Sequence, residues 1–146
     1  MKNVIITGGV GYIGSHIAIS LIQNNYNPII IDNLSNSKKK IINKLEKITK
    51  KKIIFYRADL RNKKKKKLIL NKHPCYAVIH CAGYKSVEDS IKNPLDYFNN
   101  NIVSTLSLLE CMKEKNIFKI IFSSSAAVYN SDQMLPFKET SKIGKT

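Results

Sequence analysis

The chain is poor in several residue types, and each shortage narrows what it can be. Its 146 residues include no tryptophan, three cysteines and six glycines. The cysteines are odd in number and form no CxxC pair, which argues against a disulfide framework or a metal site and favours a reducing, cytoplasmic environment. No apolar run is long enough to span a bilayer. The first predicted strand lies at the very start, so we expect no signal or transit peptide.

Acidic residues and arginine are also scarce. Ten carboxylates against 25 basic residues give a net charge of +15, and the only arginines are Arg57 and Arg61. The lysines occur in runs at 38–40, 50–52 and 63–67, without interleaved aromatic residues. Nucleic-acid sites usually rely on arginine and stacked aromatic rings. We therefore interpret the runs as a solvated basic face, and expect neither a nucleic-acid partner nor a membrane partner.

Short apolar runs alternate with helical patterns along the chain. Such strands predict an α/β fold with a parallel sheet covered on both faces, a doubly wound (Rossmann) fold with strand order 3-2-1-4-5. Residues 1–146 then form one domain, and the pattern fades after residue 125. The predicted strands are 3–7, 28–31, 53–56, 76–80 and 119–123, and the predicted helices are 12–24, 38–49, 63–71 and 94–114.

Most of the glycine lies in one stretch, "TGGVGYIGSH", at residues 7–16. Gly8, Gly11 and Gly14 follow the first predicted strand and precede a helix. Glycine permits a turn with positive φ and a close approach of backbone to a pyrophosphate, which the helix N-terminus then attracts. The spacing favours dinucleotide binding. The alternative is a tight strand–helix turn without a ligand.

Acidic residues follow the second and third strands. Asp32 comes 18 positions after Gly14, where a carboxylate can accept both adenosine ribose hydroxyls and repel a 2′-phosphate, so it favours NAD over NADP. The alternative is a helix cap or turn aspartate in "DNLSNS". Asp59 is placed to contact the adenine amino group, with Leu60 packing on the ring. A simple strand-end turn is the alternative there.

Small and hydroxyl residues follow the fourth and fifth strands. Ala82 and Gly83 leave room for a cofactor, whereas His80 is interpreted as a satisfied strand-end histidine rather than a catalyst, with no partner evident nearby. Ser125 ends the "SSS" after the fifth strand, where a small hydroxyl residue faces the pocket and can donate or accept a hydrogen bond. A local serine turn is the alternative.

Together these segments resemble a known family. "TGGVGYIGSH", "DNLSNS", "ADLR", "VIHCAGYKSVEDS", "PLDYFNNNIVSTLSLLECM" and "IIFSSSAAVY" are similar to the N-terminal half of the UDP-glucose 4-epimerase family of extended short-chain dehydrogenases/reductases, from residue 1 to about residue 140. The resemblance implies an NAD cofactor and a catalytic role for Ser125. The cofactor-binding residues it implies are Gly8, Gly11, Tyr12, Ile13, Gly14, Asp32, Asn33, Leu34, Ser35, Asn36, Ser37, Asp59, Leu60, Cys81, Ala82, Gly83, Tyr84, Lys85 and Asn100.

One departure from the family is large. The family's base is a tyrosine followed four positions later by a lysine (YxxxK), but Tyr129 is followed by Gln133. We therefore expect a chain truncated before the YxxxK helix and the substrate domain, and inactive alone. The whole protein would interconvert UDP-galactose and UDP-glucose through a 4-keto sugar, as a homodimer. Alternatives are another NAD-dependent sugar-nucleotide epimerase or dehydratase, or a non-catalytic NAD-binding module.

The truncation has a structural consequence. We expect apolar side chains of the long helix, together with the edge of "KIIF", to lie partly bare. The helix residues concerned are Ile102, Leu106, Leu108 and Leu109.

Overall fold

The fold is a five-stranded parallel sheet in the order β3-β2-β1-β4-β5, which confirms the predicted doubly wound topology. The computed structural model describes residues 1–125, 128–130 and 135–144. The strands are β1 (Lys2–Thr7), β2 (Tyr26–Asp32), β3 (Ile54–Arg57), β4 (Ala77–His80) and β5 (Ile120–Phe122). The helices are α1 (Tyr12–Gln23), α2 (Lys40–Thr49), α3 (Lys63–Lys72), α4 (Val87–Lys92), α5 (Pro94–Tyr97), a π-helical segment η1 (Phe98–Val103) and α6 (Ser104–Glu114).

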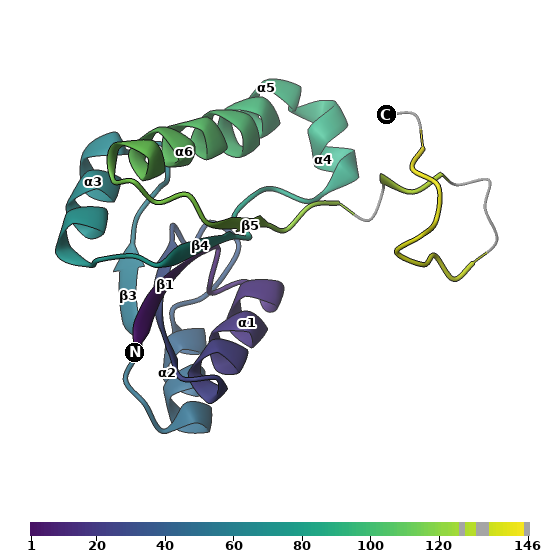
Figure 1. Cartoon of the computed structure of the whole chain (residues 1–146). Coiled ribbons are helices and arrows are strands. Elements are labelled where there is room, and N and C mark those ends of the chain that lie inside the picture. Colours follow the sequence, from purple (N-terminus) through teal and green to yellow (C-terminus); the bar gives the residue numbers. More distant parts are fainter. Residues whose placement is uncertain (126–127, 131–134, 145–146) are drawn as a thin grey trace.

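Helices cover both faces of the sheet, with α1 and α2 on one side and α3 and α6 on the other (Figure 1). Successive strand side chains point to opposite faces, so Ile5 packs with α6 residues while Ile6 packs with α1 and α2 residues. Strands buried on both faces require continuous apolar residues, which is why the central strands read as apolar runs. None of the described helices is long and apolar enough to cross a membrane.

The helical region after β4 differs from the prediction in two ways. A short helix, α4, precedes the expected one; the Ser86 side chain caps it by accepting a hydrogen bond from the Asp89 backbone N–H. The predicted helix 94–114 is continuous, but its second turn is the π-helical segment η1. A π-turn inserts an extra residue and changes which side chains share a face. The prediction assumed one uniform α-helical period, so it missed this shift.

The apolar side chains expected to be bare on the helix after β4 and on β5 are exposed, with one exception. Ile102, Leu106 and Leu109 are exposed, and so are Ile121 and Phe122 of β5. The prediction was wrong for Leu108, which is only 1% exposed and belongs to the core beside α3. It lies on the sheet-facing side of α6, opposite its exposed neighbours.

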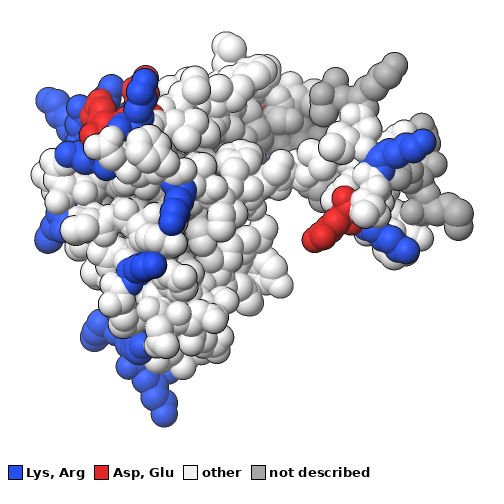
Figure 2. Space-filling view, in the orientation of Figure 1, with Lys and Arg blue, Asp and Glu red and all other residues white. Residues whose placement is uncertain are grey.

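Lysines gather over α2 and α3, and those on α3 have acidic residues beside them (Figure 2). Lys63 pairs with Glu110 and Lys67 with Glu114, which joins α3 to α6 across their exposed faces. Lys66 contradicts the interpretation of the run as solvated, because it is only 1% exposed.

Lys66 is buried because of its position in α3. It shares the inward stripe of the helix with Ile69 and Leu70, and its long aliphatic stem fills that space. Its amine donates a hydrogen bond to the Ser107 hydroxyl of α6. Burial lowers the pKa of this amine. A polar amine thus occupies a position that the pattern of the helix would fill with an apolar residue.

Replacing Lys66 by methionine is expected to stabilise the chain. Methionine fills a similar volume without a charge to desolvate, so we expect the free energy of unfolding to rise by about 1–2 kcal/mol. Urea unfolding followed by circular dichroism measures this. Lys64→Met, at an exposed position of the same helix, is the matched control and should change little. A loss of stability in Lys66→Met alone would show that the bond to Ser107 outweighs the desolvation of the amine.

Candidate functional site

A cavity of about 210 Å³ lies at the carboxyl ends of the strands. It is bounded by the segments that follow β1, β2, β3 and β4, and so includes the point between β1 and β4 where the strand order reverses. Ligands of doubly wound sheets bind at this point. All the residues predicted to contact a cofactor line the cavity except Leu34 and Ser37. Ile31, Ala58 and Ser104 line it too, and the sequence prediction did not include them.

The glycine-rich turn after β1 is packed so tightly that side chains are excluded. Gly8 has φ +67°, and a Cβ there would lie 2.7 Å from the Ala82 backbone nitrogen. A Cβ on Gly14 would lie 2.7 Å from the Gly9 Cα, inside the turn itself. The glycines therefore let two backbones and the start of α1 converge on one wall of the cavity.

The N-terminus of α1 faces the cavity through Tyr12, Ile13 and Gly14. Its N-cap, Gly11, offers no side chain, and the first turn contains no acidic residue. The first backbone N–H groups of a helix have no acceptor within the helix and carry the positive end of its dipole. This end of α1 is therefore suited to bind an anion from the cavity.

Asp32 lies at the end of β2 and is only 7% exposed. One carboxylate oxygen accepts from the Val10 backbone N–H at 3.1 Å. The other accepts from the Leu34 backbone N–H at 2.8 Å and from the Ser37 hydroxyl at 3.2 Å. The carboxylate thus ties the turn after β1 to the loop after β2. Two predicted residues do not line the cavity. The Ser37 hydroxyl bonds to Asp32 instead, and the Leu34 side chain packs into the core.

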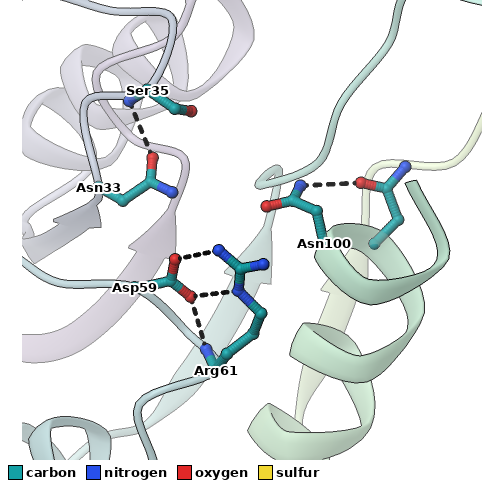
Figure 3. A network of polar contacts seen from close by, with 6 residues as sticks. Asn33, Ser35, Asp59, Arg61 and Asn100 are labelled. Carbon is teal, nitrogen blue, oxygen red and sulfur yellow. Dashed lines mark hydrogen bonds and ion pairs between the residues drawn. The ribbon is translucent and has the colours of Figure 1, made fainter. Parts of the chain in front are cut away.

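Asp59 and Arg61 form an ion pair beside the cavity, between Asn33 on one side and Asn100 on the other (Figure 3). The guanidinium contacts both carboxylate oxygens, at 3.0 and 2.7 Å, and the Arg61 backbone N–H donates to the same group at 2.8 Å. The Arg61 side chain and backbone lower the pKa of Asp59 to about 2, although partial burial opposes the shift. Asp59 is therefore an anionic acceptor at any physiological pH.

His80 is buried at the end of β4 and has partners that the sequence did not reveal. Its ring bonds to the Thr7 hydroxyl through Nδ1, and to the Thr105 hydroxyl through Nε2 at 2.8 Å. Burial, followed by the charge of Lys85, lowers the pKa of His80 to about 4, so the ring is neutral near pH 7. Pairing of β1 with β4 brings Thr7 opposite His80. Thr105 reaches the ring because α6 packs over this part of the sheet. The hydrogen bonds confirm the prediction of a satisfied strand-end histidine.

Asn101 was also missed by the sequence analysis. Its side-chain oxygen accepts from the Tyr84 backbone N–H at 2.7 Å, and its nitrogen donates to the Tyr84 carbonyl at 3.0 Å. It therefore clamps the loop that forms one wall of the cavity. Its neighbour Asn100, which was predicted, lines the cavity and donates to the Asn101 side chain at 3.0 Å. The run of three asparagines was the available signal, but helix phase decides which one faces the loop.

Ser125 is exposed and does not line the cavity. It comes three residues after the end of β5. Nearer the strand, the Ser123 backbone N–H donates to the His80 carbonyl at 3.0 Å. Among the described residues no group of three or more histidine, cysteine or acidic side chains could hold a metal ion. Gln133, the residue four positions after Tyr129, lies outside the described residues.

A Gly-rich turn at the carboxyl edge of a 3-2-1-4-5 parallel sheet, with an acid after the second strand, defines a Rossmann-type α/β protein. Residues 5–145 match the family model described as GDP-mannose 4,6 dehydratase, and the chain belongs to this family.

Several relatives that cover nearly the whole chain are named UDP-glucose 4-epimerase. The one from Erwinia amylovora is 44% identical over 144 residues, which are 99% of this chain and 43% of that protein. A curated sequence from Klebsiella pneumoniae is 42% identical over 137 residues, 94% of this chain and 99% of its own length. The structure of UDP-glucose 4-epimerase from Bifidobacterium longum in complex with NAD+ and UDP superposes with a TM-score of 0.92 at 39% identity, covering 99% of this chain and 43% of that one. The chain thus spans less than half the length of most of these relatives.

The buried, neutral His80 predicts how stability depends on pH. The unfolded chain binds a proton on this histidine below about pH 6.5, whereas the folded chain binds it only near pH 4. The stabilisation is therefore complete above about pH 6.5 and is lost as the pH falls toward 4, by up to about 3 kcal/mol.

Urea unfolding at pH 7.5 and pH 4.5 measures this loss. In His80→Asn, which cannot titrate, the difference between the two pH values should shrink. His16→Asn, at an exposed histidine of α1, should leave it as in the wild type. An equal pH dependence in wild type and His80→Asn would contradict the assignment.

Proposed function

We propose that the cavity binds NAD and that residues 1–146 are the NAD-binding unit of a UDP-glucose 4-epimerase. The observation that carries this proposal is the uncompensated N-terminus of α1 opening on a cavity that also contains the buried Asp32 carboxylate. A pyrophosphate fits the helix end, and an adenosine ribose fits the carboxylate, at the places that a dinucleotide needs. NAD is present in the solved relative from Bifidobacterium longum.

The hydrogen bonds of Asp32 refine the ribose site. A carboxylate has about four acceptor positions, and Val10, Leu34 and Ser37 occupy three of them. One ribose hydroxyl can therefore bind without rearrangement, and a second by replacing the Ser37 hydroxyl, which has the longest of the three bonds. The negative charge would repel a 2′-phosphate, so the site favours NAD over NADP.

The adenine would lie against Leu60 and donate its amino group to Asp59. The low pKa of Asp59, set by Arg61, keeps this acceptor anionic. Tyr84 and Lys85, on the wall clamped by Asn101, would lie along the path to the nicotinamide.

The whole protein would interconvert UDP-galactose and UDP-glucose as a homodimer in the cytoplasm. The names of the relatives support this proposal. The dinucleotide would supply the hydride chemistry, taking the C4 hydride of the hexose while a base takes the hydroxyl proton, and returning the hydride to the other face of the ketone. Ser125 would form a hydrogen bond with the reacting sugar hydroxyl, while the residues around the cavity would hold the cofactor in position.

Replacing Asp32 by alanine is expected to weaken NAD binding by about 2–4 kcal/mol, because charge-assisted bonds to the ribose are lost. Discrimination against NADP should fall as well. Titration calorimetry with NAD and NADP measures both effects. Asp89→Ala, at an exposed acid of α4, is the control and should bind NAD like the wild type. Equal NAD affinities for Asp32→Ala and wild type would disprove the ribose assignment.

The 146-residue chain alone is expected to show no epimerase turnover. A general base contributes about 10²–10⁴-fold to such a reaction, and the chain has no YxxxK pair to supply one. A coupled assay that follows UDP-glucose formation from UDP-galactose tests this, with a full-length relative as the positive control. NAD binding without turnover is the expected result. Turnover at ordinary enzyme rates would place the base elsewhere in these residues.

A further inference from the structure

A chain of hydrogen bonds connects the end of β1 to the π-helical segment, with the buried His80 at its centre. Thr7 and His80 are 0% and 1% exposed. The Ala82 backbone N–H lies 3.4 Å from the Thr7 hydroxyl oxygen, Thr7 bonds to Nδ1 of His80, and Nε2 of His80 bonds to the Thr105 hydroxyl. The Thr105 hydroxyl in turn bonds to the Asn101 backbone carbonyl. Every group in this chain has a bonding partner at each side.

The far end of the chain determines which ring nitrogen carries the proton. A carbonyl oxygen can only accept, so the single hydroxyl proton of Thr105 is directed to Asn101. The Thr105 oxygen must then accept from Nε2 of His80, which therefore carries the hydrogen. In a neutral ring Nδ1 is the bare acceptor, and the Thr7 hydroxyl donates to it.

All the bonds consequently run in one direction, from the Ala82 N–H to the Asn101 carbonyl. Bonds aligned in this way polarise and strengthen one another in a buried environment. Both ends of the chain touch the same wall of the cavity. Ala82 belongs to that wall, and the Asn101 side chain clamps the Tyr84 backbone two residues further on.

The two hydrogen bonds between the Asn101 side chain and the Tyr84 backbone leave the loop at Gly83 little room to move. A Cβ on Gly83 would lie 3.3 Å from the Asn101 side-chain oxygen, so the loop passes close over the amide. The clamp works only if Asn101 stays in its π-helical turn, where the Thr105 hydroxyl holds its carbonyl.

We propose that His80, as the neutral Nε2–H tautomer, is a positioning residue that fixes the cavity wall formed by residues 81–85 through Thr105 and Asn101. The ring does not line the cavity; it acts by holding the Asn101 turn against the Tyr84 loop. The proposal deepens the proposed NAD site, because that wall is the part that would face the nicotinamide half of the cofactor.

The first test is a direct observation of the tautomer in the wild-type chain. In a ¹⁵N-labelled sample near neutral pH, nuclear magnetic resonance should show His80 with a hydrogen on Nε2 and a bare Nδ1. It requires neither a variant nor a cofactor. A hydrogen on Nδ1, or on both nitrogens, would overturn the proposal.

The second test breaks the chain of bonds at Thr105. Thr105→Val removes the hydroxyl with little change in shape, and we expect amide hydrogen exchange at Tyr84 to accelerate by about tenfold. Thr105→Ser keeps the hydroxyl and should restore slow exchange. The matched control is Thr49→Val in α2, where the hydroxyl makes the same kind of bond, to the Leu45 carbonyl at 2.8 Å, far from the cavity. Unchanged exchange at Tyr84 in Thr105→Val, or equal acceleration in Thr49→Val, would overturn the proposal.

The third measurement links the wall to the cofactor. NADH binding, followed by its fluorescence, should weaken several-fold in Thr105→Val but not in Thr105→Ser or Thr49→Val. If wild type binds no NADH, the proposed function fails, while the tautomer and the exchange rates still decide the role of His80. If wild type and Thr105→Val bind NADH equally well, the wall does not position the cofactor and the proposal is overturned.

Discussion

The architecture of the site depends on one close approach between two backbones. Strands β1 and β4 are neighbours, and the chain leaving β1 must pass the chain leaving β4 at the same edge of the sheet. At Gly8 the two come so close that a single added carbon would overlap the Ala82 backbone. Gly14, in the first turn of α1, is packed as closely, because an added carbon there would overlap the backbone of Gly8 and Gly9. The starting point of α1, and hence the direction of its dipole, follows from these two contacts rather than from any side chain in the cavity.

Asp32 extends the same constraint to the next strand. Its carboxylate accepts from the backbone of the turn after β1 and from the backbone of the loop after β2, so it fixes one loop relative to the other. Leu34 takes a φ of 62°, which is unfavourable for leucine, while its N–H bonds to Asp32 and its side chain packs into the core. A group proposed to recognise the ribose thus also maintains the shape of its own pocket. Loss of Asp32 is therefore expected to affect both properties, and the NAD-to-NADP comparison is the measurement that separates recognition from shape.

Much of this arrangement could be predicted from the sequence, because it depends on order along the chain. Buried parallel strands must be apolar on both faces, so five runs with helices between them led to the correct sheet order. Residues at the end of a strand or just beyond it, such as Asp32, Asp59 and Ala82, reach the same edge of the sheet whatever the details of packing. Their presence around one cavity follows from that order.

Residues on the helix after β4 could not be predicted as well, because their positions depend on helix phase. A π-turn between residues 98 and 103 rotates all that follows, and neither hydrophobic period nor propensity indicates it. Asn101 and Thr105, the partner of His80 on this helix, were missed for this reason. The buried Lys66 was missed for a related reason: a run of five lysines suggests solvent, although a three- to four-residue period must turn one of them inward.

The two walls of the cavity are held in place by different kinds of interaction. The wall near α1 consists of backbone groups and glycines, whose positions are fixed by covalent geometry and close packing. The wall near Tyr84 is held by side chains that act in series, from Thr7 through His80 and Thr105 to Asn101. A wall held by bonds in series loses its position when any one bond is removed. A tightly packed glycine turn is disturbed when a side chain is added. Removal of a single hydroxyl should therefore loosen the Tyr84 wall and leave the α1 wall in place, so the two halves of a bound dinucleotide would respond separately to substitution.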